Sequence, residues 1–280
     1  MNISKKVLTS CAAAALVVSM SASAFAAALQ VKNDTVEYKG VKVTTPLISG
    51  SRGGATVDEK VNMQLLANSW NSIANLVTLK TPIGVMSGEE LAKESGSMKD
   101  AKENVKEFAD YLGARFLRDQ EKVGQKTPYT LNISYELKTG TDDNTLSLLQ
   151  KVESYTGGAH ANTSYVPVNY DLRTGKAIKL ADIFADGADY KSRLMTLMQI
   201  QAKGSQRIIT AVEKAAELNK EPAGLYMPKE ITGNEKFYVN ARVGELNVFY
   251  NPGEIAPISE GTKTFTFGLD TIADIIRLGK

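Results

Sequence analysis

The sequence predicts an α+β fold in which antiparallel sheets pack against helices, in two adjoining lobes. Two observations predict this class. Some segments place apolar residues at helical spacing, and others alternate apolar and polar residues as half-buried strands do. Helices and strands are grouped along the chain, so antiparallel meanders are expected instead of a parallel sheet. With 280 residues, 43% of them hydrophobic, the chain can bury the core of one or two domains.

The first 26 residues have the pattern of a secretory signal peptide. A basic start ending at Lys6 precedes an apolar run over Val7–Met20, and Ala24–Ala26 fits the small-x-small rule of signal peptidase. We therefore expect cleavage near Ala26 and an extracytoplasmic protein, periplasmic or secreted. An uncleaved anchor is the alternative, but the run is shorter than the ~20 apolar residues that cross a bilayer. Cys11 precedes the apolar run, whereas a lipid anchor needs that run upstream of its cysteine.

Charge and cysteine content narrow the classes of function. Lys5 and Lys6 are the charged residues of the leader, so the rest of the chain carries 31 basic and 31 acidic residues. Such a neutral surface offers no long-range attraction to nucleic acid or anionic lipid. The single cysteine lies in the leader, so the mature chain can form no disulfide. We expect no nucleic-acid partner and no transmembrane helix in the mature chain.

Segments of period two predict the strands. One or two strands are expected in Gln30–Thr45 around Lys39-Gly40, and Pro46 with the glycines of residues 50–54 is expected to end them. Asp171–Gly175 has the composition of a tight turn that ends in a left-handed glycine. The remaining strands are expected over Tyr129–Leu137, Leu146–Tyr155, Tyr165–Leu172, Lys236–Arg242, Glu245–Tyr250 and Thr262–Leu269.

Capping residues and periodicity predict the helices. Thr56 and Glu59 have the spacing of a capping box, which predicts a helix from Thr56 to Thr81-Pro82. Ser97 and a final Gly124 predict the limits of a second helix. An exposed connection is expected over Pro82–Gly96. Leu180–Phe184 leads into a helical region expected over Tyr190–Leu218, with a division at Gly204-Ser205, and a terminal helical turn is expected over Thr271–Leu278.

A glycine pair beside the single histidine marks the candidate binding loop. It lies where the sequence changes character, so we divide the mature chain there into an N-terminal lobe, residues 27–160, and a C-terminal lobe, residues 161–280. Glycines permit positive φ and the close approach of another group, and a tyrosine-rich sheet face can bind peptide or sugar. A bend whose imidazole satisfies backbone groups is the alternative, and we favour it. The candidate binding residues are Tyr155, Gly157, Gly158, His160 and Tyr165.

Few residues are available for catalysis. One histidine and no mature cysteine exclude a closed structural zinc site. No G-x-S-x-G elbow accompanies His160. Lys138-Thr139-Gly140 matches the K-T-G element of penicillin-binding enzymes, but the mature chain has no S-x-x-K to supply the nucleophile, so these residues are expected to end a strand and begin its turn. A carboxylate-based hydrolase needs only two acids, so that alternative stays open. We expect no enzyme activity, no cofactor and no metal.

A series of motifs resembles a known extracytoplasmic domain. The motifs are Tyr155–His160, Asp171–Lys176, Leu180–Phe184, Phe237–Val239 and Phe249–Pro257. They resemble the domain family of unknown function that is shared by the anti-sigma factor RsiV and the N-terminal region of the peptidoglycan deacetylase PdaC. The resemblance implies an α+β fold in two adjoining lobes, PdaC-like for the N-terminal lobe and RsiV-like for the C-terminal lobe. It brings no catalysis, because the deacetylase acts through a separate domain whose metal site requires two histidines.

The expected function is therefore that of a secreted, non-catalytic binding or sensing module of the bacterial cell envelope. The resemblance implies lysozyme-like protein or peptidoglycan as the partner. A carboxylate-based cell-wall hydrolase and a structural or assembly protein of the envelope are the alternatives.

Overall fold

The computed structural model describes residues 29–78, 86–124, 126–138, 144–215, 226–240 and 242–277. The chain forms two compact units, unit 1 ending at Pro128 and unit 2 beginning at Tyr129. Both units combine helices with antiparallel strands, which confirms the predicted α+β class. Within the described residues, no helix is long and apolar enough to cross a membrane. The expected signal peptide, residues 1–26, lies outside the described residues.

Unit 1 begins with a β-hairpin, as predicted. β1 (Gln30–Tyr38) pairs antiparallel with β2 (Val41–Ser49), and Tyr38 lies opposite Val41. Lys39 and Gly40 have φ values of 45° and 83°, the two positive values that a tight hairpin turn requires. Pro46 does not end β2, as the sequence predicted, but lies buried within it opposite Asn33. A proline can occupy a strand wherever the ladder does not need its N–H.

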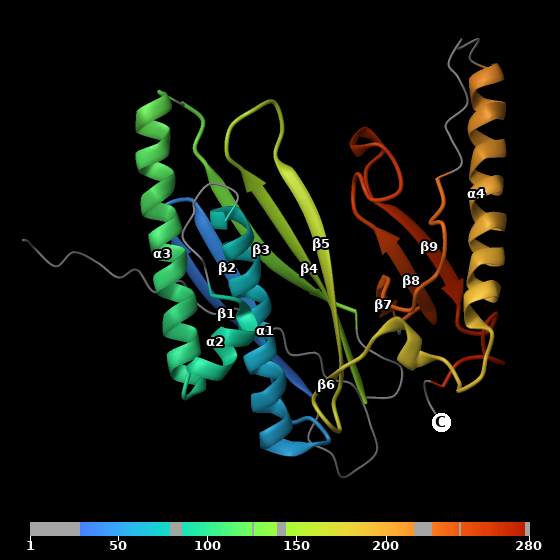
Figure 1. Ribbon diagram of the computed structural model, residues 1–280, viewed down its shortest axis with the longest axis horizontal. Helices are drawn as coiled ribbons and strands as arrows, with labels where there is room; N and C mark the ends of the chain where they lie inside the picture. Colours follow the sequence, from blue (N-terminus) through green and yellow to red (C-terminus); the bar gives the residue numbers. More distant parts are fainter. Residues whose placement is uncertain are drawn as a thin grey trace, which may run out of the picture. The chain divides into compact units, whose positions relative to one another are not determined.

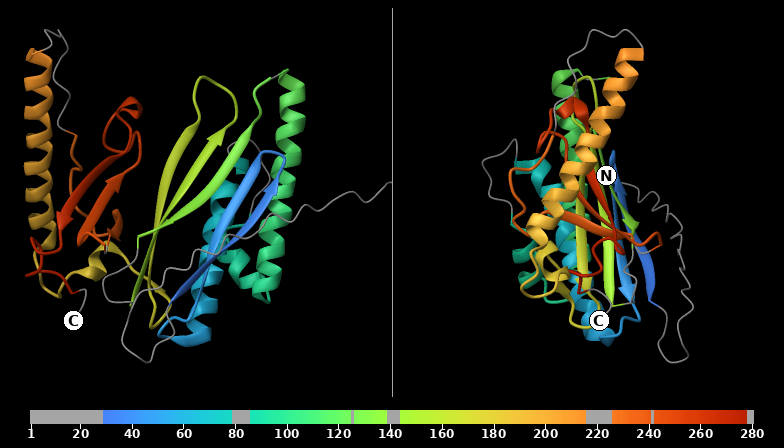
Figure 2. Two further views of the ribbon diagram at one scale, coloured as in Figure 1. Left: turned by 180° about the vertical axis from the view of Figure 1, so that it is seen from behind. Right: turned by 90° about the vertical axis from the view of Figure 1, so that its right-hand side faces the viewer.

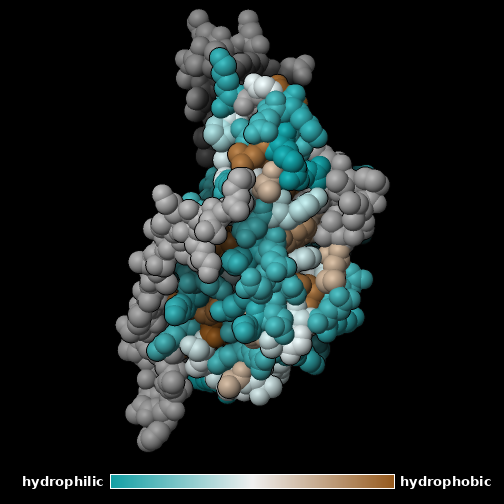
Figure 3. Space-filling model, turned by 90° about the vertical axis from the view of Figure 1, so that its left-hand side faces the viewer, coloured by the Kyte–Doolittle hydropathy of each residue, from teal (hydrophilic) through white to brown (hydrophobic). Residues whose placement is uncertain are grey.

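Helices α1 (Gly54–Thr78) and α3 (Met98–Val123) cover one face of this hairpin (Figure 2). The short helix α2 (Gly88–Glu94) packs against α1. The core of unit 1 lies between helices and strands, and its fully buried side chains include Val41, Val43, Val61, Leu65, Ile73, Val105 and Leu112. The exposed side of α3 carries charged residues such as Lys99 and Arg118, and the view of that side is mainly hydrophilic (Figure 3).

The limits of α1 and α2 differ from prediction. α1 begins at Gly54 instead of Thr56, because the Asp58 carboxylate accepts the N–H groups of Gly50 and Ser51 at 2.9 and 3.1 Å and so caps the preceding turn. The predicted end at Thr81-Pro82 lies outside the described residues. The expected connection over Pro82–Gly96 contains α2, whose capping box joins Ser87 and Glu90. α3 has the predicted cap at Ser97 and the predicted left-handed Gly124, with φ 63°.

Unit 2 contains a meander and a smaller sheet (Figure 1). β3, β4, β5 and β6 pair antiparallel in that order, and β7, β8 and β9 form a three-stranded antiparallel sheet. These strands follow the predicted segments closely. Their bounds are β3 Thr130–Leu137, β4 Thr145–Tyr155, β5 Asn162–Asp171, β6 Lys176–Ala177, β7 Lys236–Asn240, β8 Glu245–Tyr250 and β9 Lys263–Gly268. Segment 156–161, which contains the predicted lobe boundary between residues 160 and 161, connects β4 and β5.

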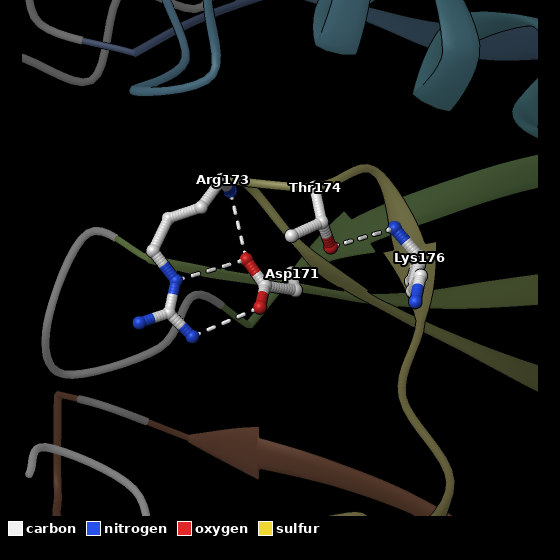
Figure 4. Close-up of polar contacts among 4 residues, drawn as sticks. All are labelled: Asp171, Arg173, Thr174 and Lys176. Carbon is white, nitrogen blue, oxygen red and sulfur yellow. Dashed lines mark hydrogen bonds and ion pairs between the residues drawn. The ribbon is translucent and has the colours of Figure 1, made fainter.

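The predicted tight turn after β5 is confirmed (Figure 4). Gly175 has φ 65°, and its N–H donates to the Asp171 carbonyl at 2.7 Å. Arg173 donates to Asp171 Oδ1 from its backbone N at 2.8 Å and to Oδ2 from Nη2 at 2.9 Å. The hydrogen bond from the Arg173 side chain is the main cause that lowers the pKa of Asp171 below its ordinary value.

The smaller sheet has its own core on one face. There it packs with the 3₁₀ helix η1 (Leu180–Ile183) and with α4 (Tyr190–Ala215). α4 runs through Gly204 without the predicted division. Gly204 is not among the described glycines that have a positive φ, so it does not interrupt the helix. The predicted C-terminal helical turn ends at Ile276, which bridges to Phe184. The buried residues of this core are Leu180, Ile183, Phe184, Leu194, Met198, Ile231, Phe237, Val239, Leu246, Val248, Phe265, Phe267, Ile272 and Ile276.

Candidate functional site

The strongest candidate site lies in unit 2, where β8 leads into the turn Asn251–Glu254. Pro252 supplies a preset φ, and Gly253 has φ 87°, a value that glycine tolerates best. The turn is closed twice: the Glu254 N–H donates to the Asn251 carbonyl at 3.1 Å, and the Asn251 N–H donates to Glu254 Oε2 at 2.8 Å. This reciprocal pair holds the backbone of the turn in one conformation.

A cavity of about 520 Å³, largely open to solvent, lies against this turn. Residues 253–257 form one wall, and residues 227–229 form the other. Proteins commonly bind small molecules in cavities of about 300–1,000 Å³ that combine apolar walls with a few polar groups. The lining residues are Met227, Pro228, Lys229, Gly253, Glu254, Ile255, Ala256 and Pro257.

The two charged residues of the lining differ in their contacts. Glu254 forms an ion pair with Lys236 of β7 through Oε1, while Oε2 accepts the Asn251 N–H. Both carboxylate oxygens are therefore engaged. Lys229 is exposed and makes no ion pair with any residue that the structure describes. The wall of the cavity thus carries one compensated acid and one uncompensated base.

The turn is joined to β5 by the side chain of Asn251. Its Oδ1 accepts the backbone N–H of Tyr165 at 2.9 Å, and its Nδ2 donates to the Tyr165 carbonyl at 2.9 Å. A side-chain amide offers the same donor and acceptor as a peptide group, so Asn251 pairs with β5 as one residue of a strand would. Tyr165, one of the five predicted binding residues, therefore lies beside the turn that lines the cavity.

The other predicted residues gather at the tip of the β4–β5 hairpin. The Tyr155 hydroxyl donates to the Gly158 carbonyl at 3.1 Å, and the Tyr155 ring meets the Tyr129 ring edge-on with centroids 6.5 Å apart. Gly157 and Gly158 have φ values of 99° and 104° and form a bend between β4 and β5. His160 follows it and is exposed. Tyr155 and Gly158 therefore contact each other at this tip, whereas Tyr165 contacts Asn251 beside the cavity.

A buried polar cluster fixes β7 to β4 and β5. The Ser147 hydroxyl contacts Asn169 Oδ1 at 2.5 Å and accepts the Val239 N–H at 3.1 Å, and Asn169 Nδ2 donates to the Phe237 carbonyl at 2.9 Å. Ser147 and Asn169 are almost wholly buried. Sequence reasoning missed these two residues, although a polar residue within an apolar strand is a signal for such a contact.

Acidic, histidine and cysteine side chains do not cluster as a metal site needs. In the segments that the structure describes, no three such residues lie close enough together to hold an ion.

The segment that contains the candidate site is similar to a family of unknown function. Residues 181–270 match the family model described as "Protein of unknown function (DUF3298)". This match runs from η1 to the end of β9 and includes every lining residue of the cavity. No match is found among the curated proteins. The match to the DUF3298 model is what the comparisons find. The more specific resemblance to the RsiV and PdaC domains stays a prediction.

Two solved structures are similar to this chain. One is a member of the DUF3298 family from Bacteroides fragilis, with 19% identity, a TM-score of 0.53 and coverage of 89% of this chain and 94% of that chain. The other is a DUF3298 family protein from Pseudomonas aeruginosa PAO1, with 12% identity, a TM-score of 0.45 and coverage of 90% and 97%. The first likeness shows that the fold of this chain occurs in a solved structure.

Proposed function

We propose that this protein is a secreted, non-catalytic binding module of the bacterial cell envelope and that its ligand contacts the cavity beside Asn251–Glu254. The cavity is the observation that carries the proposal. It has the size of a binding site and a lining in which apolar and polar surface are mixed, and its turn is fixed by Glu254 and Asn251 before any ligand arrives. Preorganisation of this kind lowers the entropy that binding costs.

The chemistry of the lining supports binding over turnover. Glu254 is the one acid in the lining, and its two oxygens are occupied by Lys236 and by the Asn251 N–H. A carboxylate-based hydrolase needs two acids that face the reacting bond. The proposal that the protein is secreted rests on the signal-peptide pattern of residues 1–26. The apolar run before Ala26 predicts that the mature protein begins near Ala27.

The resemblance to the RsiV and PdaC domains supports lysozyme-like protein or peptidoglycan as the partner. The test is a titration of residues 27–280 against lysozyme and, separately, against purified peptidoglycan. We expect one of the two to bind. Pro257→Trp, which would place an indole at the exposed rim of the cavity, should weaken that binding at least tenfold.

Val243→Trp is the matched control for this titration. Val243 is 59% exposed, lies between β7 and β8 of unit 2 and does not belong to the lining. An indole there should leave the affinity unchanged. Equal weakening by both variants would contradict a role for the cavity, and absence of binding to both partners would contradict the proposed function.

A further inference from the structure

We propose that the group that enters the cavity is an apolar organic anion, free or carried by a larger ligand, whose apolar body lies against residues 227–228 and 255–257 and whose charged group faces Lys229. The inference rests on the proposed binding function and adds the chemical class of the group that the cavity accepts. It follows from the lining, from the occupied carboxylate of Glu254 and from the uncompensated ammonium group of Lys229.

The walls of the cavity favour an apolar body. Five of the eight lining residues have apolar side chains, namely Met227, Pro228, Ile255, Ala256 and Pro257. Met227 and Ile255 also pack against the buried core of unit 2, which fixes their inner sides. The prolines are rigid, so the wall loses little conformational freedom when a ligand covers it. Burial of apolar ligand surface against these five residues therefore contributes to the affinity.

The charges of the lining favour an anionic group over a cationic one. A ligand cation would meet Lys229, and it would find Glu254 already paired with Lys236 and bonded to the Asn251 N–H. A ligand anion would meet Lys229, which forms no ion pair within the described part of the chain. Because Lys229 is exposed, the gain is that of a surface ion pair, about twofold to fivefold in affinity.

Two fluorescent probes of nearly the same shape test the inference. 8-Anilinonaphthalene-1-sulfonate is an apolar anion, and N-phenyl-1-naphthylamine has the same aromatic body without the sulfonate. Titrated into residues 27–280 at low salt, the sulfonate should bind about twofold to fivefold more tightly than the neutral probe. The difference should shrink at 1 M salt, where the Debye length falls to about 3 Å.

Variants assign the binding to the cavity and to Lys229. Lys229→Ala should weaken the sulfonate about twofold to fivefold and leave the neutral probe unchanged. Lys176→Ala is the matched control, because Lys176 is an exposed lysine of unit 2 outside the lining. Pro257→Trp and Met227→Trp should each weaken both probes. Far-UV circular dichroism and melting temperature establish that each variant is folded.

The outcomes separate this inference from the proposed function. Equal affinities for the two probes, with no effect of Lys229→Ala, would overturn the anionic ligand and leave binding at the cavity standing. Binding of both probes that survives both tryptophan variants, or failure of both probes to bind, would show that the cavity is not a binding site and would overturn both.

Discussion

At the scale of single residues, side-chain amides of unit 2 form hydrogen bonds with backbone groups of strands, as a neighbouring strand would. Asn251 bonds both backbone groups of Tyr165, and Gln201 of α4 does the same for Thr266 of β9, at 2.7 and 3.1 Å. Strand edges otherwise present unpaired N–H and C=O groups that invite pairing with other chains. The amides satisfy some of these groups and also attach a turn and a helix to the sheets.

Replacing Asn251 should therefore destabilise unit 2. Asn251→Ala leaves the N–H and C=O of Tyr165 without their partners in a partly buried place. We expect the free energy of unfolding to fall by about 1–3 kcal/mol, the cost of such unpaired groups. Urea unfolding measures it. Asn234→Ala, at an exposed side chain of the same unit, is the control and should change stability by less than ~0.5 kcal/mol. Equal losses in the two variants would contradict the role of Asn251.

The lowered pKa of Asp171 predicts a pH dependence of stability. Its carboxylate is stabilised mainly by the Arg173 side chain, so the folded pKa lies below the unfolded value of about 3.9. Stability from this pair is present above the unfolded pKa and is lost as the pH falls through the folded pKa. Asp171→Asn should thus be less stable than the parent at pH 7, by about 1 kcal/mol. Unfolding curves of the two proteins should converge near pH 2. A gap that persists in acid would contradict this cause.

At the scale of elements, the contact of α3 with the β1–β2 hairpin depends on Gly113. A Cβ at this position would lie 2.6 Å from the Tyr38 carbonyl oxygen. Gly113→Ala should therefore lower the free energy of unfolding by about 1–3 kcal/mol, although alanine favours helix.

Gly204 of α4 is the matched control for Gly113. It has open space around it, so Gly204→Ala should raise the free energy of unfolding by about 0.5–1 kcal/mol. Thermal and urea unfolding measure both variants. Stabilisation by Gly113→Ala would show that α3 does not approach Tyr38 so closely.

Capping and turn residues predicted the limits of elements well where the residues that set the limit are neighbours in the sequence. The cap at Ser97, the left-handed Gly124 and the turn at Gly175 are set by residues next to one another in sequence, and all three are confirmed. α1 starts early because Asp58 caps the turn before it from within the helix. α2 was missed although Ser87 and Glu90 carry a capping-box spacing, because seven residues are too few to show a helical period.

The candidate site was predicted only in part, for a related reason. Tyr165 and the Phe249–Pro257 motif were noted separately, and the structure joins them through Asn251. The cavity is formed by residues 227–229 and 253–257, which are distant in sequence. Their proximity depends on how β7 and β8 pack against the core of unit 2, and no periodicity or spacing encodes it.

At the scale of the whole molecule, the expected signal peptide predicts where the mature protein is found and at which residue it begins. Expressed with its own first 26 residues in a bacterium, the protein should be recovered outside the cytoplasm. Intact mass spectrometry should give a chain that begins at or near Ala27. Recovery of the full-length chain from the cytoplasmic fraction would contradict the signal peptide.

Recognition without turnover is the central claim for the whole molecule. The most direct measurement incubates residues 27–280 with insoluble peptidoglycan, and in parallel with immobilised lysozyme, and follows the bound fraction and the release of soluble reducing ends from the peptidoglycan. The account predicts that the parent binds one of the two and that Pro257→Trp binds far less. It also predicts that reducing ends stay at the level of a protein-free sample. Steady release of reducing ends by the purified protein, or a bound fraction no greater than that of Pro257→Trp, would contradict it.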